Sequence, residues 1–169
     1  MRPEYLLLPA NSAFIAFSLI FAFVLNLFPW SRMAFVPDFV ALVLVYWNVH
    51  QPRKVGMGVA FLFGLLMDVH DATLFGEHAL AYTLLSFGAI SLHRRILWFK
   101  SLGQMAHVLP LFLLALLASL VVRAVVDKAL PGWHYFLPAL AQTLLWPVAC
   151  FSLQAPQRRA LERDENRPI

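Results

Sequence analysis

Three long stretches of this chain contain no charged side chain, and they restrict its fold more than any other feature. Residues 14–28, 108–122 and 137–153 hold no Asp, Glu, Lys or Arg. Hydrophobic residues make up 61% of the 169 residues and charged residues 13%, against roughly 45–50% and about 25% in soluble domains. A soluble fold of this length cannot bury so much apolar surface, whereas lipid accepts it. We therefore expect an all-α, polytopic integral membrane protein.

Six apolar segments are candidates for transmembrane helices, because crossing the hydrocarbon core takes about 20 residues. We expect helices at residues 11–28, 37–50, 54–69, 77–92, 104–127 and 138–153. Pro29 suits the end of the first helix and Pro37 the start of the second. The second to fourth helices are short, which implies local thinning of the bilayer, burial among neighbouring helices or incomplete crossing. The sequence predicts one six-helix transmembrane bundle over residues 1–155 and a charged cytoplasmic tail over residues 156–169.

The basic residues indicate how this bundle is oriented. With a cytoplasmic amino terminus and six crossings, ten of the thirteen Lys and Arg residues face the cytoplasm, and only Arg32, Arg123 and Lys128 face the other side. The reverse orientation would invert this bias and oppose the positive-inside rule. Residues 29–32 lack the small-residue pattern of a signal-peptide cleavage site, so we expect the first helix to be retained. Both termini are therefore expected in the cytoplasm.

Charge, cysteine content and motifs argue against several other classes of protein. The net charge of +4 is explained by membrane orientation and anionic lipid headgroups rather than by nucleic acid. The single cysteine, Cys150, allows neither an intramolecular disulfide nor a thiol-rich metal site. The six histidines lack metal-ligand spacing, and no metalloprotease, serine-hydrolase or phosphate-loop motif is present. We expect no enzymatic activity, no metal, no cofactor and no nucleic-acid partner.

A stripe of small residues runs along the third expected helix. Gly56, Ala60, Gly64 and Asp68 recur at intervals of four residues, with Gly58 beside them. Residues four apart lie on one face of a helix, and small residues allow the backbone of another helix to approach closely. The stripe predicts a packing face, either inside the bundle or against a partner subunit.

A layer of charged residues is expected at the non-cytoplasmic ends of the helices. Asp38 begins the second helix, Asp68 ends the third, and Arg123 and Asp127 lie near the end of the fifth. Because these residues share one membrane level, we expect Arg123 to pair with one of the three aspartates. Asp68 is expected in the outer part of the membrane, where an ionisable side chain is a functional candidate, or else it ends its helix in water. Asp38 complements the dipole of its helix, and Glu77 is expected in water.

Ordered Pro, Gly, Asp and Trp positions give the chain a resemblance to a known family. The segments that carry it are Pro37-Asp38-Phe39, Tyr46-Trp47, Pro52-Arg53-Lys54-Val55-Gly56, Phe63-Gly64-Leu65-Leu66-Met67-Asp68, Leu74-Phe75-Gly76-Glu77-His78 and Leu144-Leu145-Trp146-Pro147. With these segments the chain resembles the rod shape-determining protein MreD family. The resemblance covers nearly the whole chain, and its distinctive part lies between residues 37 and 80.

The resemblance implies a non-enzymatic scaffold subunit of the cell-elongation complex in the bacterial inner membrane. Its implied partner is MreC, and through MreC the MreB filaments, RodA and the elongation-specific penicillin-binding protein, which together support sidewall peptidoglycan synthesis and cell shape. The family has been likened to the six-helix substrate-binding components of energy-coupling-factor transporters, which implies a cavity open to the outside. Two alternatives remain: a transporter component that binds a small polar molecule, and a membrane hydrolase that uses Asp38 and Asp68 as an acid pair.

Overall fold

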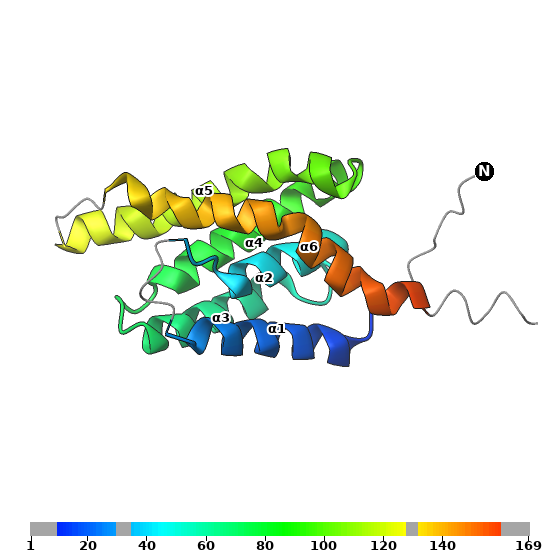
Figure 1. The fold of residues 1–169 in the computed structure, drawn as a ribbon. Helices are drawn as coiled ribbons and strands as arrows, with labels where there is room; N and C mark the ends of the chain where they lie inside the picture. The colour runs from blue at the N-terminus through cyan, green and yellow to red at the C-terminus, as the bar shows by residue number, and fades with distance from the viewer. Residues whose placement is uncertain (1–9, 30–34, 128–131, 160–169) are drawn as a thin grey trace, which may run out of the picture.

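The computed structural model describes residues 10–29, 35–127 and 132–159, and within them every regular element is helical. The elements are α1 (Ser12–Leu27), α2 (Phe39–His50), α3 (Gly56–His70), α4 (Glu77–Leu97), α5 (Ser101–Asp127), the 3-10 helix η1 (Trp133–Phe136) and α6 (Leu137–Arg159). Figure 1 shows these helices packed side by side as a bundle. The expected all-α class is confirmed.

Two helices extend well past their predicted ends. α4 reaches Leu97 rather than residue 92, and α6 reaches Arg159 rather than residue 153. The sequence predicts both ends where polar and charged residues replace apolar ones. Arg, Gln and Ala are good helix formers, however, so each helix continues after its apolar segment has ended. With 21 residues, α4 is not the short helix that the sequence predicted. The first residues of the expected tail, 156–159, are helical as well.

Among the described residues, two segments combine the length and the hydropathy needed to cross a membrane. They are Ser101–Val126 and Trp133–Gln157, which contain 26 and 25 residues. α1, α2 and α3 are apolar but shorter, with 16, 12 and 15 residues. At about 1.5 Å of rise per residue, α2 extends only about 18 Å, against a hydrocarbon core about 30 Å thick. A straight α2 therefore crosses completely only where the bilayer is locally thinned around it.

α2 forms the centre of the bundle. All of its residues from Val40 to Val49 except Val43 are buried, and the helix contacts α1, α3, α4 and α6. The indole N–H of Trp47 donates a hydrogen bond to the Ser18 hydroxyl of α1 at 2.8 Å. Neighbouring helices therefore surround α2, so its short length leaves little of its backbone facing lipid.

The outer surface of the bundle is apolar, unlike the surface of a soluble domain. Phe17 of α1, Val125 of α5 and Phe151 of α6 are each more than 60% exposed. Several polar side chains lie inside instead: Asn48, Asp68, Glu77, Ser86, Gln104 and Gln142. This distribution matches a bundle whose exterior faces lipid, because ionisable groups in membranes turn towards protein or an internal cavity.

The helix ends meet at two opposite ends of the bundle. Figure 1 shows α1 beginning and α6 ending at one end, where the α2–α3 and α4–α5 connections also lie. At the other end, which we call the distal end, α1, α3 and α5 finish while α2, α4 and η1 begin. The charged residues of the expected outer layer belong to these distal helix ends.

Candidate functional site at the distal end

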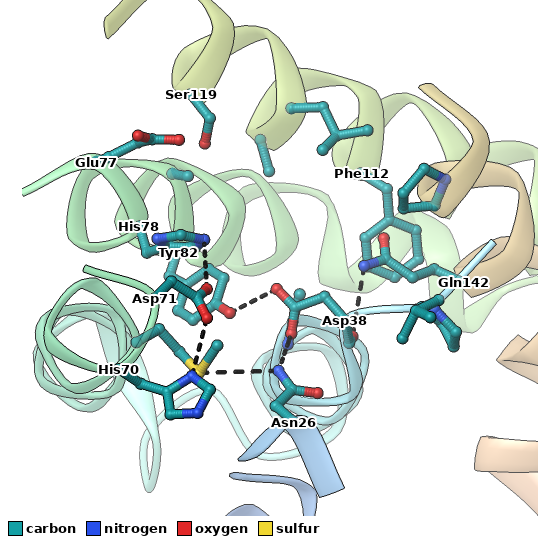
Figure 2. Close-up of a pocket in the computed structure, with 18 of the residues that line it drawn as sticks. Asn26, Asp38, His70, Asp71, Glu77, His78, Tyr82, Phe112, Ser119 and Gln142 are labelled. Carbon is teal, nitrogen blue, oxygen red and sulfur yellow. Dashed lines mark hydrogen bonds and ion pairs between the residues drawn. The ribbon is translucent and has the colours of Figure 1, made fainter. Parts of the chain in front are cut away.

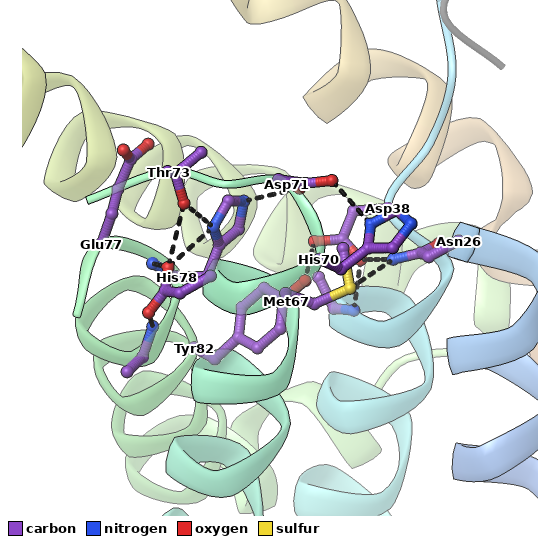
Figure 3. A network of polar contacts seen from close by, with 12 residues as sticks. Asn26, Asp38, Met67, His70, Asp71, Thr73, Glu77, His78 and Tyr82 are labelled. Carbon is purple, nitrogen blue, oxygen red and sulfur yellow. Dashed lines mark hydrogen bonds and ion pairs between the residues drawn. The ribbon is translucent and has the colours of Figure 1, made fainter. Parts of the chain in front are cut away.

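Asp68 closes the turn between α3 and α4 from a buried position. It is 1% exposed, and its carboxylate accepts hydrogen bonds from the backbone N–H groups of Gly76 (2.8 Å), His78 (2.7 Å) and Ala79 (3.4 Å). The side chains of Thr73 and His78, labelled in Figure 3, contact the same carboxylate at 3.3 and 3.0 Å. Asp68 therefore does not simply face water: it packs against the turn that precedes α4.

This carboxylate acts as the N-cap of α4, although it comes from α3. Gly76 occupies the N-cap position with a φ of +105° and has no side chain to accept a hydrogen bond. The first N–H groups of a helix need acceptors, and a negative charge there complements the helix dipole. Asp68 supplies both from across the turn, so it fixes where α4 starts relative to α3.

Asp38 joins three helices. As the N-cap of α2 it accepts a hydrogen bond from the N–H of Ala41 at 3.0 Å. It also accepts hydrogen bonds from the side-chain amide of Asn26 in α1 (2.8 Å) and from the hydroxyl of Tyr82 in α4 (2.5 Å). The Asn26 carbonyl in turn accepts from the N–H of Phe39 at 3.0 Å. Figure 3 shows this convergence, which extends Asp38 beyond the dipole role that we expected.

Arg123 of α5 forms an ion pair with Glu77 in the first turn of α4. The Arg123 Nε atom lies 2.6 Å from Glu77 Oε1, and the guanidinium carbon lies 5.7 Å from the centre of the Tyr135 ring. Glu77 is only 2% exposed, so the expectation that it lies in water is wrong. The first turn of α4 packs against α5, which turns the Glu77 side chain towards that helix.

The sequence predicted a different partner for Arg123, namely Asp38, Asp68 or Asp127. Asp38 and Asp68 instead accept hydrogen bonds at the N-termini of α2 and α4. Asp127 ends α5, and its side chain lies outside the described part of the structure. Asp38, Asp68 and Arg123 lie at helix ends on the same side of the bundle, and Glu77 is the acidic partner that the structure describes for Arg123.

The small-residue stripe of α3 has two different surroundings. A Cβ added at Gly64 would stand 2.4 Å from the Cα of Ala79, and Ala60 is fully buried. A Cβ added at Gly56 or Gly58 would meet nothing within 4 Å. The distal half of the stripe therefore packs inside the bundle against α4, while the half around Gly58 is open.

A cavity of about 470 Å³ lies among these helix ends, and all six α-helices contribute to its walls. We call it the distal cavity. Its polar lining residues are Asn26, Asp38, His70, Asp71, Glu77, His78, Tyr82, Ser119, Arg123, Tyr135 and Gln142. Figure 2 shows Asp38 between Tyr82 and Gln142, with the Phe112 ring beside Gln142. The family resemblance implied a cavity, but the sequence alone did not identify the residues around it.

Sequence reasoning missed Asn26 and Tyr82, which complete the contacts of Asp38. Asn26 is the only amide side chain within the uncharged stretch of residues 14–28. A polar side chain within an apolar helix needs a partner, so this isolated amide was a usable signal. Tyr82 has no such signal, because an aromatic residue in an apolar helix is also an ordinary packing residue.

The arrangement suits bracing and binding better than catalysis. A hydrolase would need Asp38 and Asp68 free to exchange protons with a substrate, but helix N-termini already engage both carboxylates. In the described ranges, no group of three or more His, Cys, Asp or Glu residues is placed to hold a metal ion. The site is a polar network that links α1 to α2, α2 to α4, α3 to α4 and α4 to α5.

Comparisons with known proteins agree with the resemblance seen in the sequence. The family model of the rod shape-determining protein MreD matches residues 10–154. The curated rod shape-determining protein MreD of Haemophilus influenzae is 36% identical over 146 residues, which cover 83% of this chain and 88% of that protein. No solved structure matches the chain.

Proposed function

Because the chain belongs to the MreD family of rod shape-determining proteins, we propose that it is a membrane scaffold of the cell-elongation complex. A role in determining rod shape follows from the family itself. The proposal adds that the chain binds MreC and thereby supports sidewall peptidoglycan synthesis with MreB, RodA and the elongation-specific penicillin-binding protein. The observation that carries it is the distal network, whose charged groups brace helices against one another under an apolar exterior.

The proposed topology has six crossings, with both termini in the cytoplasm and the distal end at the periplasmic face. It is supported by the position of the α1 start and the α6 end at the same end of the bundle. The basic residues Arg53 and Lys54 and the basic cluster Arg94 and Arg95 belong to that end as well, as the positive-inside rule requires. The proposal keeps the predicted division into a bundle over residues 1–155 and a charged cytoplasmic tail over residues 156–169.

We propose that the open half of the α3 stripe receives the transmembrane helix of MreC. Gly64 is not available, because α4 already covers it. Gly58 is exposed, and its neighbours one turn along, Phe61 and Leu62, are 46% and 62% exposed. A small residue beside large apolar ones provides the close backbone approach and the dispersion contacts that drive helix association in lipid.

Affinity purification of the tagged chain in mild detergent tests this proposal. We expect MreC to be recovered in fixed proportion with the wild-type chain. Gly58→Leu should reduce that recovery about tenfold, because its side chain would hold the partner helix away. Ser91→Leu is the matched control, since it adds the same side chain at an exposed position of α4. Equal recovery with both variants, or no MreC with the wild-type chain, would contradict the proposal.

A second candidate function is that of a transporter component which binds a small polar molecule, and the distal cavity favours it. Under this alternative the tagged chain would be recovered without MreC or other elongation proteins. Deleting the gene for this chain would then leave cell shape unchanged and reduce the uptake of one solute. The same purification, combined with measurements of cell shape, therefore separates the two functions.

A further inference from the structure

We propose that the distal cavity is a binding site for an organic ammonium group, carried by a phospholipid headgroup or by a soluble amine. This inference goes beyond the scaffold function and does not depend on MreC. At about 470 Å³ the cavity is within the usual range for small-ligand sites, about 300–1,000 Å³.

The charges that line the cavity are predominantly negative. Three carboxylates, those of Asp38, Asp71 and Glu77, face one guanidinium, that of Arg123. Arg123 and Glu77 are 2.6 Å apart and neutralise each other. With the histidines counted as neutral, the two carboxylates of Asp38 and Asp71 remain without an opposing formal charge among the described lining residues. A cleft with walls of low dielectric concentrates the field of such groups and attracts cations.

Asp38 is the stronger of the two candidates to contact a cation. Its hydrogen-bond donors are an amide, a backbone N–H and a phenol, and none of them carries a charge. Asp71 instead lies 2.8 Å from a ring nitrogen of His70 and 3.7 Å from one of His78. A carboxylate with only neutral donors gains most from an added positive charge.

A second, independent feature of the cavity is an amide carbonyl that lacks a donor. Gln142 is 4% exposed and lines the cavity. Its Nε2 atom donates to the backbone carbonyl of Asp38 at 3.4 Å, as Figure 2 shows, but its carbonyl oxygen accepts no hydrogen bond from any described residue. An amide oxygen accepts up to two hydrogen bonds, so this carbonyl at the cavity wall is open to an N–H donor from a ligand.

An ammonium group fits these surroundings better than a metal ion or an anion does. It has three N–H donors, which match the Asp38 carboxylate and the Gln142 carbonyl. The rings of Tyr82 and Phe112 line the same space, and aromatic rings attract cations. Metal binding needs a closer set of ligands than the described residues provide, and an anion would meet the uncompensated carboxylates.

The test uses the full chain in dodecyl maltoside and measures its thermal unfolding midpoint against the concentration of 1,5-diaminopentane. We expect a saturable rise that 1,5-pentanediol does not produce. Asp38→Asn should weaken the apparent affinity about tenfold or more, because it removes the charge but keeps an equally good N-cap for α2. The matched control, Asp164→Asn, removes one charge from the predicted cytoplasmic tail and should leave the affinity unchanged.

Gln142→Leu keeps the inference testable if Asp38→Asn does not fold, and should weaken the affinity several-fold. The proposal would be overturned if neither the diamine nor phosphatidylethanolamine raised the unfolding midpoint in a saturable way. It would also be overturned if the wild-type chain and both cavity variants bound with equal affinity. Phosphatidylethanolamine and phosphatidylcholine added to the micelles identify the source, since only the former has ammonium N–H donors. A rise with phosphatidylethanolamine alone assigns a lipid headgroup, and one with the diamine alone a soluble amine. Equal rises with both lipids and none with the diamine would also overturn it.

Discussion

Replacing Asp68 with alanine is expected to lower the free energy of unfolding by about 3 kcal/mol or more. The substitution removes the acceptor of three backbone N–H groups at the start of α4 in a site that is 1% exposed. Each buried donor left without a partner costs about 1–3 kcal/mol, and the loss of a helix N-cap about 1 kcal/mol. Unfolding of the purified chain by SDS titration in mixed micelles, followed by circular dichroism, measures the change.

Asp71→Ala is the matched control for Asp68→Ala. Asp71 carries the same charge three residues later, but its side chain is 37% exposed, and its ion-pair contacts within the described residues are with two imidazole rings. We expect its loss to change the free energy of unfolding by about 0.5 kcal/mol or less. If both variants unfold at the same SDS fraction, Asp68 does not cap α4 as described.

Gly64→Ala should destabilise the bundle by about 1–3 kcal/mol, and Gly64→Leu should prevent recovery of folded protein. The added Cβ would lie 2.4 Å from the Cα and 2.6 Å from the backbone nitrogen of Ala79. Because these contacts are with backbone, relief requires α3 and α4 to move apart at the most extensive helix contact in the bundle. The same SDS titration measures the loss.

Gly58→Ala provides the control, because the same methyl group meets nothing within 4 Å. Alanine favours helix over glycine by about 1 kcal/mol, so this variant should be as stable as the wild type or slightly more stable. A loss of stability equal to that of Gly64→Ala would show that helix propensity or lipid packing, rather than contact with α4, explains the small-residue stripe.

The fold class could be predicted from the sequence because lipid solvation leaves a direct compositional signal. Uncharged stretches of about 15 residues or more indicate membrane helices, and Pro37 with Asp38 marks the start of α2 correctly to within a residue or two. The ends of α4 and α6 were harder to predict. A loss of apolar residues marks the boundary of the membrane, whereas the helix continues as long as its backbone hydrogen bonds do.

The charged layer was predicted at the level of helix ends, but its pairing was not. Which carboxylate meets Arg123 depends on how α4 and α5 are rotated about their axes, and Glu77 is 46 residues away in sequence. Capping of α4 by Asp68 depends on the tight α3–α4 turn and on the left-handed backbone of Gly76. Local sequence patterns do not encode these rotations, and they left Asp68 as either a functional candidate or a helix-terminal residue in water.

The small-residue stripe shows the same division between local and tertiary information. A four-residue spacing predicted one packing face that includes Gly56, Gly58, Ala60 and Gly64. The crossing of α3 and α4 decides which part of that face is covered. It brings Ala79 against Gly64 and leaves Gly58 uncovered. Only the three-dimensional structure separates the two halves.

Cell shape tests the central claim most directly, namely that this chain is a shape-determining scaffold braced by its distal network. A rod-shaped bacterium depleted of its own copy would express the wild-type chain, Asp71→Ala or Asp68→Ala at matched membrane levels, and cell width and length would be measured by microscopy. We predict normal rods with the wild-type chain and with Asp71→Ala, and wide or round cells with Asp68→Ala. Round cells with the wild-type chain, or normal rods with all three, would contradict the account.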